Sequence, residues 1–108
     1  MKRGDIVIVS APGDYGKPRP AVVIQSDKLQ SMDSILVSLI TSMLVEAPLF
    51  RLSIEPSQKN GLKQKSQIMV DKIVAMPRAK CGPVIGNLER QEVITLNHIL
   101  ALVIGIAD

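Results

Sequence analysis

Prolines and glycines divide this chain into short segments. Residues 11–20 (APGDYGKPRP) contain three prolines and two glycines, and residues 77–86 contain two of each. Proline has no amide hydrogen and glycine favours turns, so neither stretch is expected to continue a helix or a strand ladder. We therefore predict a surface loop at each stretch, with only short elements between them.

The aliphatic runs between these loops have the length and composition of β-strands. The predicted strands are residues 5–10, 21–25, 34–42, 48–55 and 66–76. Apolar and polar positions alternate in 48–55 (PLFRLSIE), which is typical of a half-exposed strand. The polar pair Asp71-Lys72 interrupts the last strand and indicates a bulge or bend. Residues 56–65, centred on Asn60-Gly61, are too many for a tight hairpin and are predicted to be a polar loop.

A single helix is predicted from about Glu89 to Ile104. Apolar residues at 93, 96, 100 and 103 recur at helical spacing and form one stripe. Glu89 and Glu92 place negative charge at the helix N-terminus, and Gly105 follows the last turn. Short strands and long loops, with no helices between strands, favour a mainly β fold. We expect a small, strongly curved antiparallel sheet or SH3-like barrel with a C-terminal α-helix.

The length and composition predict one domain (1–108) that assembles with a second copy of itself. Of the 108 residues, 46% are hydrophobic but only Tyr15 and Phe50 are aromatic, so the core is expected to be aliphatic. A domain of this size buries only about two-thirds of the surface that its unfolded chain exposes. With a mean hydropathy of +0.25, apolar surface should remain exposed, and a homodimer is the commonest way to cover it.

The location indicated by the sequence is the cytoplasm. Cys81 is the only cysteine, which excludes an intrachain disulfide and fits a reducing compartment. The apolar run near the N-terminus (residues 6–9) is shorter than the roughly 7 to 15 residues of a signal-peptide core. The apolar C-terminal segment is also shorter than the roughly 20 residues that span a bilayer, so no membrane contact is expected.

Several classes of catalytic site are excluded by what the sequence lacks. It has no glycine-rich phosphate loop before a helix, no CxxC pair and no HExxH motif. His98 is the only histidine, which rules out a two-histidine nuclease mechanism within one chain. The net charge of +3 is concentrated in residues 59–80, which hold six basic residues and one acid. An isolated run of lysines is more often a solvated face than a binding site.

Two short motifs could act on a phosphate. In Lys17-Pro18-Arg19-Pro20, the prolines restrict the backbone around Arg19 and reduce the entropy lost when its guanidinium binds an anion. The hydroxyls of Thr41-Ser42, at the end of a predicted strand, could donate to a phosphate oxygen. Taken singly, the first motif could simply stiffen a loop and the second could be an ordinary strand end.

Residues 3–27 (RGDIVIVSAPGDYGKPRPAVVIQSD) resemble the N-terminal signature of the MazF/PemK family of bacterial toxins. That signature is a basic residue with Gly-Asp-Ile-Val, a loop, and Arg-Pro-Ala-Val-Val-Ile. The resemblance continues in order along nearly the whole chain. Its further segments are LITS (39–42), Gly61-Leu62 with Ser66, VDKI (70–73), and IGNL (85–88) followed by Glu92 and an aliphatic helix.

The resemblance implies a dimeric SH3-like barrel of the CcdB/MazF type with endoribonuclease activity. Such a toxin cleaves single-stranded mRNA at specific sequences without a metal or cofactor, and stops growth until an antitoxin neutralises it. Arg19 matches the catalytic arginine and Thr41 the catalytic hydroxyl residue. The implied partners are a small cognate antitoxin and, only as the toxin–antitoxin complex, operator DNA.

Some positions depart from the family pattern. Asp71 matches an acidic position that some relatives use near the scissile phosphate, but their arginine two residues earlier is Met69 here. Val74 replaces another arginine, and a later basic cluster is reduced to Arg78 and Lys80. Arg19 therefore becomes the main candidate for both proton transfer and charge stabilisation. Asp71 is either a third catalytic residue or a bulge residue paired with backbone or with Lys72.

Contacts to RNA would have to be made with few aromatic side chains. Tyr15, in the same predicted loop as Arg19, is the candidate for stacking on a base. The candidate phosphate contacts are Lys17, Ser42, Lys63, Lys65 and Lys72.

Two alternative functions remain at this stage. One is a DNA gyrase poison of the CcdB type, which depends on a C-terminal tip that includes a tryptophan; this chain has no tryptophan and ends in Gly105-Ile106-Ala-Asp. The other is a catalytically inactive family member that acts as a binding or repressor subunit, against which the presence of both Arg19 and Thr41 argues.

Overall fold

The fold is one antiparallel β-sheet with a helix at its C-terminal end. It is seen in a computed structural model that describes residues 1–10 and 17–108. The strands are β1 (Asp5–Val9), β2 (Arg19–Val23), β3 (Ser34–Thr41), β4 (Arg51–Ile54), β5 (Ser66–Pro77) and β6 (Cys81–Asn87). Short 3-10 helices cover Asp27–Leu29 and Arg78–Lys80, and the α-helix α1 is Arg90–Val103.

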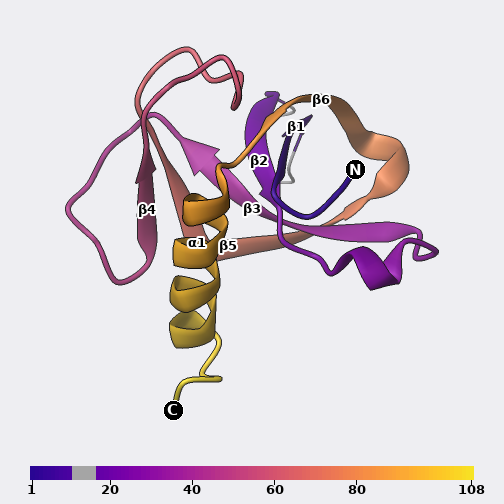
Figure 1. The fold of residues 1–108 in the computed structure, drawn as a ribbon. Coiled ribbons are helices and arrows are strands. Elements are labelled where there is room, and N and C mark those ends of the chain that lie inside the picture. Colours follow the sequence, from indigo (N-terminus) through magenta and orange to yellow (C-terminus); the bar gives the residue numbers. More distant parts are fainter. Residues whose placement is uncertain (11–16) are drawn as a thin grey trace.

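The sheet is strongly curved but not closed. Its strand order is β4-β5-β3-β2-β1-β6, and each neighbouring pair is antiparallel. Figure 1 shows β5 and β3 running across the molecule, with the N-terminal strands on one side and β4 with α1 on the other. The mainly β prediction is confirmed, although the barrel remains open between its edge strands.

A bulge in β5 gives the sheet much of its curvature. Ser38 of β3 pairs with Ile73, whereas Ile40 pairs with Ile68, so β5 contains extra residues between these two pairs. The first part of β5 pairs with β4 and the end of β3, and the second part pairs with the beginning of β3. A bulge of this kind bends a strand and increases its twist. The interruption predicted at Asp71-Lys72 is therefore confirmed.

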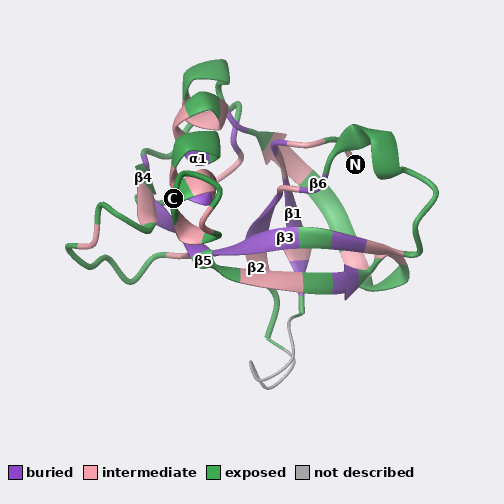
Figure 2. Ribbon diagram, turned by 90° about the horizontal axis from the view of Figure 1, so that it is seen from below, coloured by how far each residue is buried: buried purple, intermediate pink, exposed green. Residues whose placement is uncertain are grey.

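The core is aliphatic and lies on both faces of the sheet. Because side chains alternate along a strand, Val7 and Val9 enter one cluster while Ile6 enters the other. The second cluster is covered by α1, which buries Leu96 and Leu100. Figure 2 shows buried positions running through the strands while the outer side of the helix is exposed. Neither cluster includes an aromatic residue in the part of the chain that is described.

Helix α1 begins and ends close to the predicted residues. Glu89 is its N-cap, and the Glu89 N–H donates to Glu92 Oε1 at 2.8 Å in a capping box. Gly105 follows the helix with a φ of +83°, a conformation that glycine adopts without strain. No helix in the described ranges is long and apolar enough to cross a membrane.

Three predicted boundaries were wrong. Residues 77–86 were expected to be a loop, but Cys81–Asn87 form β6. This strand is at the sheet edge and has an irregular register with β1, which is where a strand accommodates proline and glycine. Arg19 and Pro20 were also expected in a loop, but they begin β2, which pairs with β3 only from Ala21 onward.

The third correction concerns β4. It begins at Arg51 rather than at residue 48, because the chain first makes a turn in which the N–H groups of Phe50 and Arg51 donate to Ala47 C=O. The expected apolar face is consequently shorter: Ile54 is buried, but the Phe50 side chain is exposed.

Replacing Leu96 should test the contribution of α1 to the core. Leu96 is fully buried, so Leu96→Ala is expected to lower the free energy of unfolding by about 2 to 5 kcal/mol, measured by urea titration. Gln91→Ala, at an exposed position of the same helix, should change it by less than about 0.5 kcal/mol. Similar effects of the two substitutions would contradict the packing of α1 described here.

Candidate active site

A cleft opens where β2 begins and β3 ends. Its volume is about 290 Å³. Three segments that are distant in the sequence form its walls: the entry to β2, the exit from β3, and the loop that leads into β5. The lining residues are Lys17, Pro18, Arg19, Pro20, Ile40, Thr41, Ser42, Leu62, Lys63, Gln64 and Ser66.

The register of β2 and β3 brings Arg19 and Thr41 to the same place. Ala21 pairs with Leu39 in this antiparallel ladder. Arg19 lies two residues before Ala21, and Thr41 lies two residues after Leu39. Side chains two residues apart in a strand point to the same face. Both line the cleft, so strand pairing joins the two candidate catalytic residues, which are 22 positions apart in the sequence.

Arg19 is held by both its neighbours and its strand. It is half-buried as the first residue of β2 and pairs with Val9 of β1. Pro18 and Pro20 fix the backbone on either side, so fewer conformations are lost when the side chain is ordered. The guanidinium is a fork of donors that suits phosphate oxygens.

One acceptor site of the Thr41 hydroxyl is occupied. It is the last residue of β3, and its Oγ1 accepts the N–H of Met43 at 3.1 Å. Because this contact occupies an acceptor site, the O–H hydrogen is directed elsewhere and can be donated to a group in the cleft. Ser42, the next residue, is exposed and adds a second hydroxyl to the lining.

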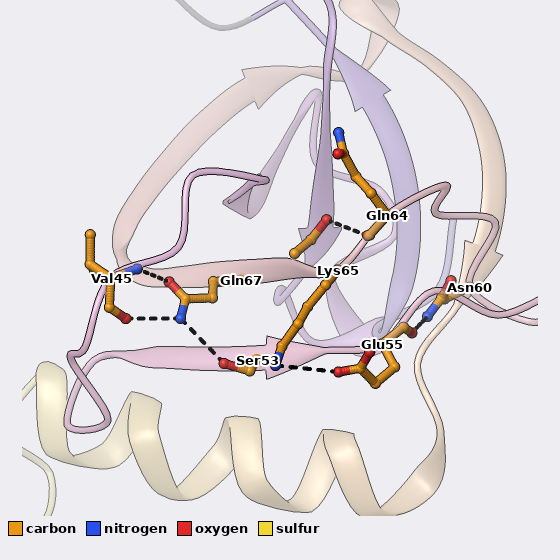
Figure 3. A network of polar contacts seen from close by, with 8 residues as sticks. Val45, Ser53, Glu55, Asn60, Gln64, Lys65 and Gln67 are labelled. Carbon is orange, nitrogen blue, oxygen red and sulfur yellow. Dashed lines mark hydrogen bonds and ion pairs between the residues drawn. The ribbon is translucent and has the colours of Figure 1, made fainter.

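The loop 56–65 forms the opposite wall, and Asn60 shapes it from within. This side chain is 3% exposed. Its Oδ1 accepts the N–H groups of Ser57 and Leu62 at 3.0 and 2.9 Å. Its Nδ2 donates to Glu55 C=O at 2.8 Å, and Figure 3 shows this bond. These bonds fix the turn that leads to Lys63 and Gln64, as expected from an Asn-Gly pair in a loop.

The same loop is held against β6 by two glycines. A Cβ on Gly61 would lie 2.2 Å from Ile85 O, and one on Gly86 would lie 2.4 Å from Lys59 O. Gly61 also has a φ of +70°. The backbones can approach this closely only because neither position has a side chain, so the cleft wall is anchored to the edge strand.

The cleft carries positive charge. Lys17, Arg19 and Lys63 line it, and no acidic residue is present among the described residues of the lining. A concave site with charges of one sign attracts ions of the opposite sign. With a guanidinium and two hydroxyls, the site is suited to a phosphodiester.

The other predicted RNA contacts are more scattered. Lys65 lies outside the cleft lining, and its Nζ is 3.5 Å from Glu55 Oε2 (Figure 3). Lys72 and Asp71 are exposed at the bulge of β5, also outside the lining. Neither a hydrogen bond nor an ion pair of the Asp71 carboxylate occurs among the described residues, so the alternative in which it pairs with backbone or with Lys72 is not seen there. Tyr15 lies outside the described residues.

The departures from the family pattern have a structural reason. Met69 is 6% exposed within the first core cluster, and Val74 is partly buried against the same cluster, so in this chain both side chains contribute to packing. The Arg78 side chain donates to Met32 C=O and Leu29 C=O and so ties the 3-10 helix after β5 to the β2–β3 connection.

Sequence reasoning missed three residues on the loop side of the cleft. Leu62, Gln64 and Ser66 line the site but were not singled out for it. The signal was the Gly61-Leu62 segment with Ser66, which carried the family resemblance. Its relation to Arg19 becomes visible only once β5 is placed beside β3.

Other chemically versatile side chains lie outside the cleft lining. His98 is exposed on α1, and Cys81 is in β6. Burial raises the pKa of the Cys81 thiol, and the Arg78 guanidinium opposes this effect, so Cys81 is not an activated thiolate. In residues 1–10 and 17–108, no group of three or more His, Cys, Asp and Glu residues could hold a metal ion.

The fold is that of a small protein with one curved sheet, and its cleft contains Arg19 and Thr41. Residues 2–104 match the family described as PemK-like, MazF-like toxin of type II toxin–antitoxin system. The chain belongs to this family of toxin endoribonucleases. It is 37% identical to the protein named probable endoribonuclease MazF of Mycolicibacterium smegmatis, over 99% of both chains.

Solved structures have the same fold. The Mycobacterium tuberculosis toxin MazF-mt6 superposes with a TM-score of 0.81 at 20% identity, covering 94% of this chain and 96% of its own. A mycobacterial endoribonuclease in complex with its cognate antitoxin gives a TM-score of 0.82 at 15% identity, covering 98% and 96%. MazF from Deinococcus radiodurans gives 0.77 at 16% identity, covering 97% and 96%.

Gly86→Ala should test the anchoring of the cleft wall. The added Cβ would overlap the backbone of the loop, and overpacking of this kind costs about 1 to 3 kcal/mol in the free energy of unfolding, measured by urea titration. Gly82→Ala in the same strand is the matched comparison and should cost less. Its Cβ would lie 3.0 Å from Ile8 O, whereas the Cβ at residue 86 would lie 2.4 Å from Lys59 O. A larger loss for Gly82→Ala than for Gly86→Ala would contradict this account.

Proposed function

We propose that this protein is the toxin of a type II toxin–antitoxin system and cleaves single-stranded mRNA at specific sequences without a metal ion. The observation that supports this most directly is the β2–β3 register, which brings Arg19 and Thr41 into one positively charged cleft. Cleavage of mRNA would stop translation and growth.

In the proposed reaction, the ribose 2′-oxygen attacks the adjacent phosphorus and the bond to the 5′-oxygen breaks. The 2′-hydroxyl loses its proton, the 5′-oxygen gains one, and the products are a 2′,3′-cyclic phosphate and a 5′-hydroxyl. Negative charge increases on the non-bridging oxygens in the transition state. The guanidinium of Arg19 and the hydroxyl of Thr41 stabilise that charge, a contribution that is usually the largest single one in catalysis.

Arg19 is the main candidate for proton transfer as well as charge stabilisation, and the proton lost by the 2′-hydroxyl balances the one gained by the 5′-oxygen. Asp71 contributes if the bound RNA extends beyond the cleft to the bulge of β5. Lys17, Lys63 and Ser42 line the cleft and hold the backbone of the RNA. Lys65 and Lys72 act from outside it, and Tyr15 is proposed to stack on a base.

Exposed apolar side chains support a homodimer. Leu36, Ile104 and Ile106 are 40%, 55% and 74% exposed. They line a groove of about 410 Å³ between α1 and the sheet. Large apolar patches are uncommon on monomers, and a second copy of the chain would cover this one.

The proposed regulator is a small antitoxin in the same cytoplasm. The mycobacterial endoribonuclease of similar fold was solved with its cognate antitoxin, and the Deinococcus radiodurans protein was solved as MazE-MazF. An acidic antitoxin segment would compete with RNA for the charges of the cleft. Operator DNA would be bound only by the complex of toxin and antitoxin.

Arg19→Ala tests the reaction. The purified protein is expected to cleave a long single-stranded RNA in EDTA, and the substitution should lower the rate by about 100- to 1,000-fold, as removal of one charge-stabilising donor does in other enzymes. Arg19→Lys keeps the charge but not the two-donor geometry, so its cleavage rate should lie between those of wild type and Arg19→Ala. Analysis of the RNA ends should find a cyclic phosphate. If the wild-type protein cleaves no RNA across varied sequences, or cleaves it only with added metal, the proposed reaction is wrong.

The lysines that line the cleft should contribute more to RNA binding than the lysines outside it. Each phosphate contact on a single strand contributes about 0.7 to the slope of log affinity against log salt. Lys63→Gln is therefore expected to reduce the salt slope of RNA binding by about that amount. Lys65→Gln is the matched control, because Lys65 lies outside the lining and beside Glu55, and its effect should be smaller. Equal effects would contradict this view of the RNA path.

A further inference from the structure

The side chain of Gln67 uses all of its hydrogen-bonding capacity next to the cleft. Gln67 is the second residue of β5, is 6% exposed, and pairs with Thr41 on one side. Its Oε1 accepts the Val45 N–H at 3.1 Å and Arg51 Nη1 at 3.0 Å. Its Nε2 donates to Val45 C=O at 2.9 Å and to Ser53 Oγ at 3.2 Å (Figure 3). An amide side chain offers two donors and two principal acceptor sites, so none is left.

Arg51 holds the same segment at a second point. Arg51 Nη1 also donates to Met43 C=O at 3.1 Å. The N–H of Met43 is the group that donates to Thr41 Oγ1. Both backbone groups of Met43 are therefore bonded, and both backbone groups of Val45 are bonded to Gln67. We refer to these contacts of Gln67 and Arg51 with residues 43 and 45 as the clamp.

The segment after Thr41 has little else to hold it. Residues 42–46 are not in a helix or strand, and the side chains of Met43, Leu44 and Val45 are 76%, 45% and 44% exposed. Side-chain packing thus contributes little to the path of this segment. Opening the clamp would break the two hydrogen bonds between the buried Gln67 amide and Val45, which is costly in a protein interior. The clamp is therefore what fixes the direction of the Met43 N–H.

We propose that Gln67 and Arg51 are positioning residues for Thr41 in RNA cleavage; this rests on the proposed function. They hold Met43 so that its N–H occupies an acceptor site of the Thr41 hydroxyl, and the O–H hydrogen is directed to the phosphate in the cleft. Neither Gln67 nor Arg51 lines that cleft. Loss of the clamp leaves Thr41 in place but lets its hydroxyl turn away from the reacting phosphate.

The test compares Gln67→Leu in two backgrounds, using a short RNA that contains one cleavage site. In the wild-type background the substitution should lower kcat by at least about tenfold, because small misplacements of catalytic groups are costly. KM should change by less than about twofold. In a Thr41→Val background the same substitution should have little further effect, since there is no hydroxyl left to orient. Gln67→Glu keeps the two acceptor contacts and should retain more activity than Gln67→Leu.

Gln91→Leu, at an exposed position of α1, is the matched control and should leave kcat unchanged. Thermal unfolding identifies any variant that fails to fold. If Gln67→Leu is one of these, Arg51→Met takes its place, because it removes the donor to Met43 while leaving the Gln67 contacts with Val45. Equal losses of kcat with and without the Thr41 hydroxyl would overturn the proposal.

Backbone amide hydrogen exchange provides a readout that does not depend on activity. In Gln67→Leu, the Met43 and Val45 amides should exchange at least about tenfold faster than in wild type. The amides of α1 should not change. Unchanged exchange at both residues would overturn the clamp. If wild type cleaves no RNA, the proposed function fails and the role in cleavage fails with it, although faster exchange would still establish the clamp.

Discussion

The pairing of β3 with both β2 and β5 is the constraint on which the rest of the structure depends. Through β2 it fixes the position of Arg19, and through β5 it fixes the loop that closes the cleft. The bulge in β5 lets one strand serve both halves of the sheet. Without this bend, the sheet would be flatter.

Core and site occupy different stretches of the same strands, with the site where β2 and β5 begin and β3 ends. In the first half of β5, Ser66 faces the cleft, Gln67 faces the segment that leaves β3, and Ile68 enters the core beneath α1. Three neighbouring residues thus have three different surroundings. A one-residue slip in the register of β5 would exchange these roles, so the geometry of the site and the stability of the core are specified together.

Much of the fold could be predicted from the sequence because local signals were strong. Aliphatic runs located β1, β3 and β5, and helical periodicity with Glu89 and Glu92 located α1. β6 was missed because Pro83 and two glycines are typical of loops, and only pairing with β1 makes a strand there. Of the site, Arg19 and Thr41 could be named from motifs. The clamp could not, since the partners of Gln67 are 14 to 22 residues away and depend on the tertiary structure.

The attachment of the loop 56–65 to β6 has a consequence for how such a cleft can diverge. The residues that set the path of this loop, Asn60 and Gly61, point inward or approach β6, whereas Lys63 and Gln64 are exposed at the cleft. The path of the loop backbone and the side chains that the loop presents to the cleft therefore depend on different residues of one short segment. Substitutions at 63 and 64 can alter what the wall offers to a ligand while the backbone stays where it is. Related chains could in this way acquire new recognition properties one residue at a time, without passing through a destabilised intermediate.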